Sequence, residues 1–451
     1  MKSPDPRTSM TDRRPLSFGI RAPLVLASLC AAGASARAQD PPAPQAEPHS
    51  EAQRIERLEQ ENVELHRRLD LVAEEVERSR LGALVPSVTE GEHGMGRAAS
   101  KIYSVEQGVS IGGYGEALYE NFQGSGKSDL IDLVRAVLYV GYKFDERWLF
   151  NSELEFEHAS TGQDGEVSVE FAYLDRLVSR YLNFRAGLLL VPMGFLNELH
   201  EPTTFPSARR PGLERLILPT TWRESGAGMF GEAGDFSYRA YVLAGLDAAG
   251  FAAGGLRGGR QSGSESLAED FAFTGRIDYA GAPGLVVGAS AWWGDSGQDL
   301  AGPGGEIEVG TTIVDLHAEY RWRALRLRTL LARAELDDVA DLDAALGLTG
   351  MQSVGEALEG GYVEVGYDVW AARNPGSRAA LTPFVRWETY DTQADVPSGF
   401  ASDPAHDVEI TTVGVAYQPI DSIVIKLDAM DVENEAGTGV DQINVAFGFI
   451  F

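Results

Sequence analysis

The sequence has little cysteine and little lysine. Cys30 is the single cysteine, and lysine stands at only five of the 38 basic positions, so arginine carries most of the positive charge. With one cysteine the chain can form no internal disulfide and no metal site built from several thiolates. The net formal charge is −29. Because nucleic acid is also anionic, a nucleic-acid partner is not expected.

The sequence also lacks an apolar run long enough for a membrane-spanning helix. Its longest run, residues 22–36, follows a basic stretch (Arg13, Arg14) and leads to Ala36-Arg37-Ala38, which has small residues at the two positions that a signal peptidase reads. This pattern predicts a secretory signal peptide over residues 1–38, and Cys30 lies within it. A membrane protein without such helices must cross as a closed β-barrel, because open sheet edges cannot be satisfied in hydrocarbon.

The carboxyl-terminal residues alternate strictly between apolar and small or polar side chains. Ile443, Val445, Phe447, Phe449 and Phe451 occupy every second position. A period of two predicts a strand with one apolar and one wet face. Bacterial outer-membrane barrels end in this way, which makes Phe451 the expected signal for the barrel-assembly machinery. A soluble protein that ends on a core strand is the alternative.

The same alternation runs through residues 108–451, and its polar face is strongly charged. In one segment Glu153, Glu155 and Glu157 alternate with Leu154 and Phe156. Unpaired carboxylates in a sandwich core would each cost several kcal/mol, whereas a water-filled lumen accommodates them. The expected fold is therefore all-β: a transmembrane antiparallel barrel of about sixteen strands, with outer-membrane lipid outside it. The expected strands cover residues 109–122, 131–144, 147–159, 165–178, 181–191, 222–232, 236–246, 268–280, 284–295, 309–322, 324–336, 361–371, 380–391, 408–418, 421–431 and 440–451.

Three segments of different composition and periodicity precede the expected barrel. Residues 39–49 form a proline-rich spacer, residues 50–80 follow a helical heptad, and residues 81–107 have no period and are expected to be a linker. The heptad predicts a short periplasmic coiled coil that holds a homotrimer together, with a polar residue at one core position to fix its register. An isolated charged helix is the alternative. The expected oligomerisation residues are Ile55, Leu58, Asn62, Leu65, Leu69 and Val72.

One long segment, residues 192–221, interrupts the alternation after the fifth expected strand. It is rich in proline and carries Arg209, Arg210 and Arg215 close to Glu198 and Glu201. Long irregular segments in compact folds are usually functional. We expect this one to fold into the lumen, where charges of both signs would set up a transverse field across a narrow pore. An external loop with solvated charges is the alternative.

Several motifs together resemble the phosphate-selective porin O/P family: GYGE at 113–116, SELEFEHA at 152–159, GLLLVPMGF at 187–195 and LPTTWRESGAG at 218–228. The resemblance implies a sixteen-stranded homotrimeric diffusion channel whose anion-selective members use an arginine ladder and a lysine-rich collar. The collar has no clear counterpart here, because lysine is scarce, so phosphate selectivity is not carried over. The candidate pore-lining residues are Arg135, Arg185, Arg209, Arg210, Arg215, Arg276, Arg321, Glu153, Glu155 and Glu157.

These patterns favour an outer-membrane porin of a Gram-negative-type bacterium, passing small hydrophilic solutes or inorganic ions. No cofactor and no metal are expected, and no HExxH motif or nucleophile elbow points to an enzyme. Two other classes stay open. One is a structural tether whose coiled coil contacts the periplasm or cell wall, with an incidental or plugged pore. The other is a barrel-embedded hydrolase.

Overall fold

The computed structural model describes residues 58, 60, 62–68, 91–162, 165–374 and 377–451. By internal contacts the chain divides into two compact units, Met1–Glu74 and Glu75–Phe451. The expected signal peptide, the proline-rich spacer and residues 81–90 of the expected linker lie outside the described residues.

In the first unit, the described residues are helical and expose an apolar seam. Leu58 and Leu65 are 58% and 59% exposed, although both belong to the expected heptad core. Glu64 pairs with Arg67 at 3.2 Å and Arg68 at 3.1 Å along the same helix. Ile55, Leu69 and Val72 fall outside the described residues. The helix is thus seen in part, and its assembly into a coiled coil stays a prediction.

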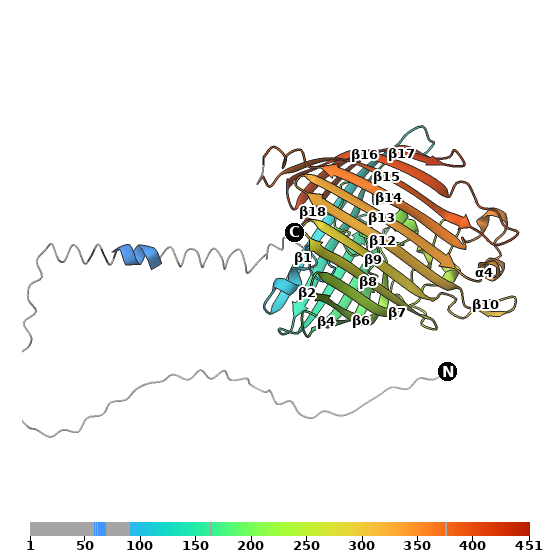
Figure 1. Ribbon diagram of the computed structural model, residues 1–451, viewed down its shortest axis with the longest axis horizontal. Coiled ribbons are helices and arrows are strands. Elements are labelled where there is room, and N and C mark those ends of the chain that lie inside the picture. Colours follow the sequence, from blue (N-terminus) through green and yellow to red (C-terminus); the bar gives the residue numbers. More distant parts are fainter. Residues whose placement is uncertain (1–57, 59, 61, 69–90, 163–164, 375–376) are drawn as a thin grey trace, which may run out of the picture. The chain divides into compact units, whose positions relative to one another are not determined.

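The second unit is a closed barrel in which, within the described residues, sixteen strands pair antiparallel with their neighbours (Figure 1). The first and last strands, β1 and β18, close it through pairs such as Tyr114 with Ile450 and Tyr119 with Val445. The expectation of about sixteen strands is therefore confirmed. A separate two-stranded hairpin, β10–β11, lies outside the barrel sheet, and the alternation did not predict it.

The barrel strands follow the alternating segments of the sequence, most of them to within a few residues at each end. In chain order the strands are β1 (Gly108–Phe122), β2 (Leu130–Lys143), β3 (Trp148–Glu157), β4 (Val167–Leu177), β5 (Asn183–Leu190), β6 (Arg223–Ala233), β7 (Phe236–Ala244), β8 (Phe271–Ala282), β9 (Leu285–Asp295), β10 (Leu300–Gly302), β11 (Gly305–Ile307), β12 (Gly310–Trp322), β13 (Leu325–Leu336), β14 (Ala357–Tyr367), β15 (Ala380–Asp395), β16 (Asp407–Ile420), β17 (Ile423–Asn434) and β18 (Gln442–Ile450).

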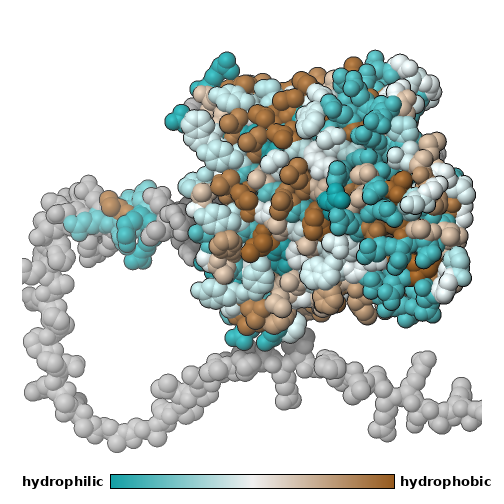
Figure 2. Space-filling view, turned by 45° about the vertical axis from the view of Figure 1, so that its right-hand side comes forward, coloured by the Kyte–Doolittle hydropathy of each residue, from teal (hydrophilic) through white to brown (hydrophobic). Residues whose placement is uncertain are grey.

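Apolar side chains cover the outside of the barrel and polar ones face inward. On β17, Ile425 and Leu427 are 43% and 49% exposed, while Lys426 and Asp428 between and beside them are 1% and 2% exposed. Successive strand residues point to opposite faces, so this pattern is what a lipid-facing exterior and a polar interior require. In Figure 2 hydrophobic residues gather over the side of the barrel and hydrophilic ones toward its right-hand end.

Short turns and long connections alternate between the two ends of the barrel. At the end that holds the carboxyl terminus, β12 and β13 are joined by two residues, 323–324, and β16 and β17 by residues 421–422. The opposite end carries the long connections, including residues 245–270 and 337–356. The short helices are α2 (Lys101–Ser104), α3 (Gly212–Leu216) and α4 (Val339–Leu346), with 3-10 turns η1 (Ala248–Gly250), η2 (Arg257–Gly259) and η3 (Gly350–Gln352). Among the described residues, none of the helices is long and apolar enough to cross a membrane.

Residues 91–104 differ from the linker that the sequence suggests. Met95, Ala98, Ala99 and Ile102 are buried in the same cluster as residues of the barrel interior. The side chain of Asn151, which faces the interior from β3, donates to the carbonyl of Ala99 at 3.0 Å. Small residues allow this close fit, and they give no helical or strand period from which it could be predicted.

Candidate functional site

The segment that we call the constriction segment, residues 192–221, runs through the interior of the barrel. The Gly194 N–H donates to Asp315 of β12 at 3.0 Å, and Arg326 of β13 donates to the carbonyl of Thr204 at 2.8 Å. Lys426 of β17 donates to the carbonyl of Ser207 at 2.9 Å. Three separate strands therefore hold it from the inside, which is where the constriction of a channel would lie.

Glu214, in the short helix α3, fixes the fold of the constriction segment. One carboxylate oxygen accepts the N–H groups of Phe195 at 2.9 Å and Leu196 at 2.7 Å, and the other accepts the hydroxyl of Tyr362 at 2.8 Å. The side chain is fully buried, and burial raises its pKa. Charge-assisted bonds of this kind are about twice as strong as neutral ones, so Glu214 ties two turns of the segment to the wall.

Glutamates on β1 to β4 form an acidic wall, and some of the predicted pore-lining arginines lie against it. Arg135 lies 3.2 Å from Glu155 and 3.7 Å from Glu116. Arg209 of the constriction segment pairs with Glu120 of β1. His200 of the same segment lies 3.2 Å from Glu153. The structure thus brings Arg135, Arg209, Glu153 and Glu155 together at one side of the lumen, with Glu157 half-buried beside them.

A basic cluster of four arginines, Arg210, Arg215, Arg257 and Arg260, lies close to this wall. Arg210 donates to the carbonyl of His200 at 3.3 Å, and Arg215 is exposed. Burial, together with repulsion from Arg260, Arg215 and Arg210, lowers the pKa of Arg257. Burial likewise lowers the pKa of Arg260, with Arg223 as the next cause. The arrangement brings positive charge from two connections close to the glutamates of β1 to β4, so charges of both signs meet inside the barrel.

The other predicted arginines pair with carboxylates elsewhere in the barrel. Arg185 pairs with Asp175 at 2.8 Å beside residues 91–104. Arg276 pairs with Asp278 at 2.8 Å, in a network where Asp278 also lies 2.8 Å from Nε2 of His317. His317 Nδ1 in turn lies 2.6 Å from Asp315. Both ring nitrogens therefore face carboxylates, and Nε2 also lies 2.9 Å from Arg276, so this ring is held in the wall by a polar network.

Arg321 borders a cavity at the end of the barrel that has the short turns. The cavity has a volume of about 510 Å³ and lies between residues 91–97, the constriction segment and the wall. Arg321, Arg326 and Arg328 all contact one carboxylate, Glu319, with Arg326 at 2.9 Å. Three cations on one anion leave the cavity with surplus positive charge.

Comparison with known proteins places the chain in a family. An uncharacterized protein of Aquifex aeolicus (strain VF5) is 37% identical over 364 residues, which cover 77% of this chain and 81% of that protein. This chain belongs to the same family. No family model matches the sequence.

Solved structures with the same fold are outer-membrane barrels. The loop L8 deletion mutant of OmpT, an outer membrane protein of Vibrio cholerae, aligns with a TM-score of 0.50 at 13% identity, covering 77% of this chain and 100% of that one. Salmonella typhi OmpF in complex with daunomycin aligns with a TM-score of 0.52 at 12% identity, covering 77% and 98%. At this identity the likeness shows the fold: a sixteen-stranded outer-membrane porin barrel.

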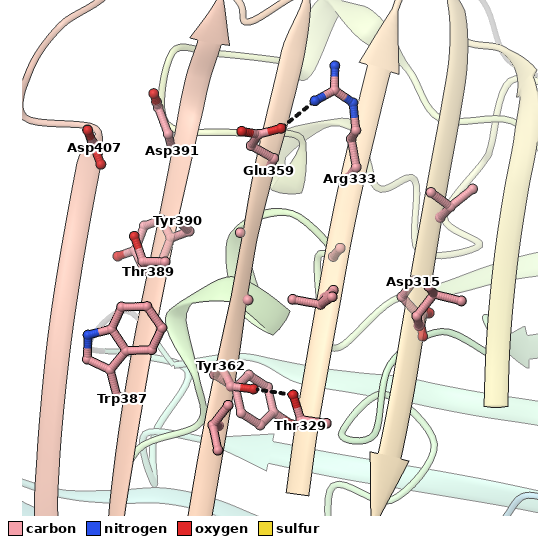
Figure 3. A pocket seen from close by; sticks show the side chains of 17 residues that line it. Asp315, Thr329, Arg333, Glu359, Tyr362, Trp387, Thr389, Tyr390, Asp391 and Asp407 are labelled. Carbon is pink, nitrogen blue, oxygen red and sulfur yellow. Dashed lines mark hydrogen bonds and ion pairs between the residues drawn. The ribbon is translucent and has the colours of Figure 1, made fainter. Parts of the chain in front are cut away.

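This protein also has a groove on the outer face of its barrel, separate from the interior. It measures about 640 Å³ and crosses β12 to β16, where Leu316, Leu331 and Trp387 project outward around Gly361. Figure 3 shows the ion pair between Arg333 and Glu359 near one end of this groove. The sheet separates the groove from the constriction, so it belongs to the lipid-facing surface and not to the passage.

Sequence reasoning missed Arg257, Arg260, Asp175 and Asp278. The two arginines lie in the long connection of residues 245–270, and no local sequence pattern distinguishes them. The two aspartates had a usable signal, because each stands on the inward parity of its strand. Asp278 is two residues after Arg276, on the same face.

Proposed function

We propose that this protein is an outer-membrane diffusion channel for small hydrophilic solutes or inorganic ions. The observation that carries the proposal is the charged constriction segment inside the closed barrel, where Arg209, Arg210 and Arg257 lie close to the glutamates of β1 to β4. A polar, charged path enclosed by an apolar exterior serves passage through a membrane, and the protein's part in it is steric and electrostatic rather than chemical.

The pairing of charges refines the expected selectivity. The porin O/P resemblance implies an arginine ladder, and in this structure Arg135, Arg185 and Arg276 each contact a carboxylate. Such pairs cancel much of each other's field at a distance. We therefore propose that discrimination between ions arises at the constriction, where Arg210 and Arg215 have no carboxylate within ion-pair distance among the described salt bridges, rather than along the full length of the lumen.

We also propose how the protein is oriented and how it assembles. The end of the barrel with short turns would face the periplasm, together with the helix around residues 62–68, and the exposed Leu58 and Leu65 would be covered by the same helix of two further copies. Phe451 would act as the signal for the barrel-assembly machinery. A homotrimer in outer-membrane lipid is the resulting proposal.

Liposome swelling tests this function. Vesicles that contain the purified full-length protein are diluted into uncharged sugars of increasing size. A channel lets small sugars enter and the vesicles swell, with rates that fall steeply as the sugar grows. Vesicles that swell no faster than protein-free ones, when insertion has been verified, would contradict the proposal.

A structural tether is the second candidate, and one observation favours it. Arg386 and Lys426 face the interior yet are 0% and 1% exposed, because the constriction segment packs over them. The interior is thus well filled. A tether would co-sediment with purified cell wall through its amino-terminal region and would show no solute flux, whereas the proposed channel shows flux whether or not it co-sediments.

A further inference from the structure

Residues 92–104, which we call the plug segment, occupy the half of the lumen next to β2 to β5. Ile102 packs against Gly141 of β2, where an added Cβ would lie 3.1 Å from the Ile102 Cβ. Asn151 of β3 donates to the carbonyl of Ala99, and Tyr103 donates to Asp175 of β4 at 2.7 Å. The segment therefore lines the inside of the wall and takes space through which a solute would have to pass.

The plug segment also touches the constriction segment above it. Glu201 accepts the N–H of Ala98 at 2.8 Å and that of Ala99 at 3.4 Å. Burial raises the pKa of Glu201. A Cβ added at Gly96 would lie 2.4 Å from a carboxylate oxygen of Glu201, so a larger residue here would have to displace that carboxylate. Small residues thus let the two segments close on each other at one point.

The barrel is complete without the plug segment. The strand β1 pairs with β18 on one side and β2 on the other, and these registers start at Gly108, after the plug ends. On the side away from β2 to β5 lies the cavity of about 510 Å³, which Gly96 and Arg97 border. A segment that is not part of the sheet and has free volume beside it can move without opening the barrel.

The part of the barrel wall that the plug segment covers carries polar side chains, which water can hydrate. The side chains against it include Asn151, the ion pair of Asp175 with Arg185, and Glu201. Polar groups left by a departing segment would be hydrated instead of orphaned, so its departure does not strand a buried charge. The apolar surface that would have to be given up is that of Met95, Ala98, Ala99 and Ile102.

We propose that residues 92–104 form a gate: seated as in this structure they close the periplasmic half of the lumen, and displaced from β2 to β5 they open it. The inference rests on the proposed channel function and adds its regulation. The cavity and the space vacated beside β2 to β5 then join into one passage.

A reversible crosslink tests the gate. Ile102→Cys with Gly141→Cys places two Cβ atoms close to the separation that a disulfide requires, after a shift of a few tenths of an ångström. The mature chain has no other cysteine if Cys30 leaves with the signal. In planar bilayers with the trimeric full-length protein, we expect the oxidised variant to pass about tenfold less current than the reduced one. Dithiothreitol restores the current.

A second variant moves the gate the other way. Gly96→Val pushes against Glu201 and should unseat the plug segment, raising the fraction of time that the channel is open several-fold. Gly126→Val is the matched control, because a Cβ added at Gly126 meets nothing within 4 Å. The heat-dependent shift of the folded barrel on gels shows whether each variant has folded.

The outcomes separate the gate from the channel. Equal current before and after reduction, with the crosslink verified by mass, overturns the gate and leaves the channel in place. Equal opening of Gly96→Val and Gly126→Val, both folded, also overturns it. Absence of current in every variant, reduced and inserted, overturns the gate and the proposed function together.

Discussion

Arg185 and Asp175 face each other across neighbouring strands, joined by two hydrogen bonds of 2.8 and 3.0 Å. Arg185 also donates at 2.7 Å to the hydroxyl of Tyr103, which donates at 2.7 Å to Asp175. The guanidinium stacks over Tyr173 at 4.1 Å. The pair is buried, and Tyr103 of the plug segment is hydrogen-bonded to both of its members. The pair therefore anchors the plug segment to the wall.

Breaking this pair should destabilise the protein. Arg185→Leu leaves Asp175 as an uncompensated buried charge, and we expect a loss of about 3–5 kcal/mol in the free energy of unfolding. Urea unfolding in lipid vesicles, followed by tryptophan fluorescence, measures it. Arg185→Leu with Asp175→Leu should recover most of the loss. Arg180→Ala is the control, because its pair with Glu232 is largely exposed. Equal losses for Arg185→Leu and Arg180→Ala would contradict the burial argument.

The constriction should set ion selectivity. Arg209→Ala with Arg210→Ala removes two positive charges that face the glutamates of β1 to β4, so cations gain relative to anions. The reversal potential in a KCl gradient should shift toward that of a cation-selective channel. Arg333→Ala serves as the control, since Arg333 lies on the outer face. An unchanged potential in the double variant would mean that these arginines do not border the ion path.

The exposed seam of the amino-terminal helix should hold copies together. Leu58→Asp with Leu65→Asp places charges in the expected core of the coil and should reduce the crosslinked trimer sharply. Val63→Asp is the comparison, because Val63 is also exposed but lies off the seam. Crosslinking of the purified full-length proteins gives the readout. Wild-type protein that yields only monomer would refute the trimer, and equal loss in both variants would refute the heptad register.

The last residue should matter more for assembly than for stability. Phe451 exchanges backbone hydrogen bonds of 2.9 and 3.1 Å with Gly113, which Phe451→Ala would retain. We expect the level of this variant in the outer membrane to fall, while its urea unfolding after refolding in vitro stays near that of the wild type. Phe447→Ala is the control for loss of one outward aromatic ring. Equal membrane levels of the two variants would argue against an assembly signal at Phe451.

The strands were predictable because the information is local. On β17 the order Ile425, Lys426, Leu427, Asp428 alone assigns each side chain to its face, and the structure confirms the assignment. Strand ends were less certain. The strand β14 was expected at 361–371 but spans Ala357–Tyr367. Gly360 and Gly361 obscured its start, and Asp368 ends it by accepting the N–H of Trp370 at 2.9 Å.

The contents of the lumen were harder to predict because they depend on distant partners. Ala98 and Glu201 are 103 positions apart, and Arg386 reaches Ser207 over 179 positions. Parity gives the direction of a strand side chain but not what it meets. Arg135 and Arg185 lie inside the barrel, as parity indicates, while their carboxylate partners and the burial of residues 92–104 emerged only from the fold.

Single-channel recording tests the central claim most directly. Purified full-length protein is added to a planar bilayer in KCl, and the current is followed at constant voltage. If the charged interior carries ions between the constriction segment and the glutamates of β1 to β4, insertions produce uniform current steps whose ion preference changes in the Arg209→Ala, Arg210→Ala variant. A bilayer that stays silent while inserted protein is recovered from it would contradict the account.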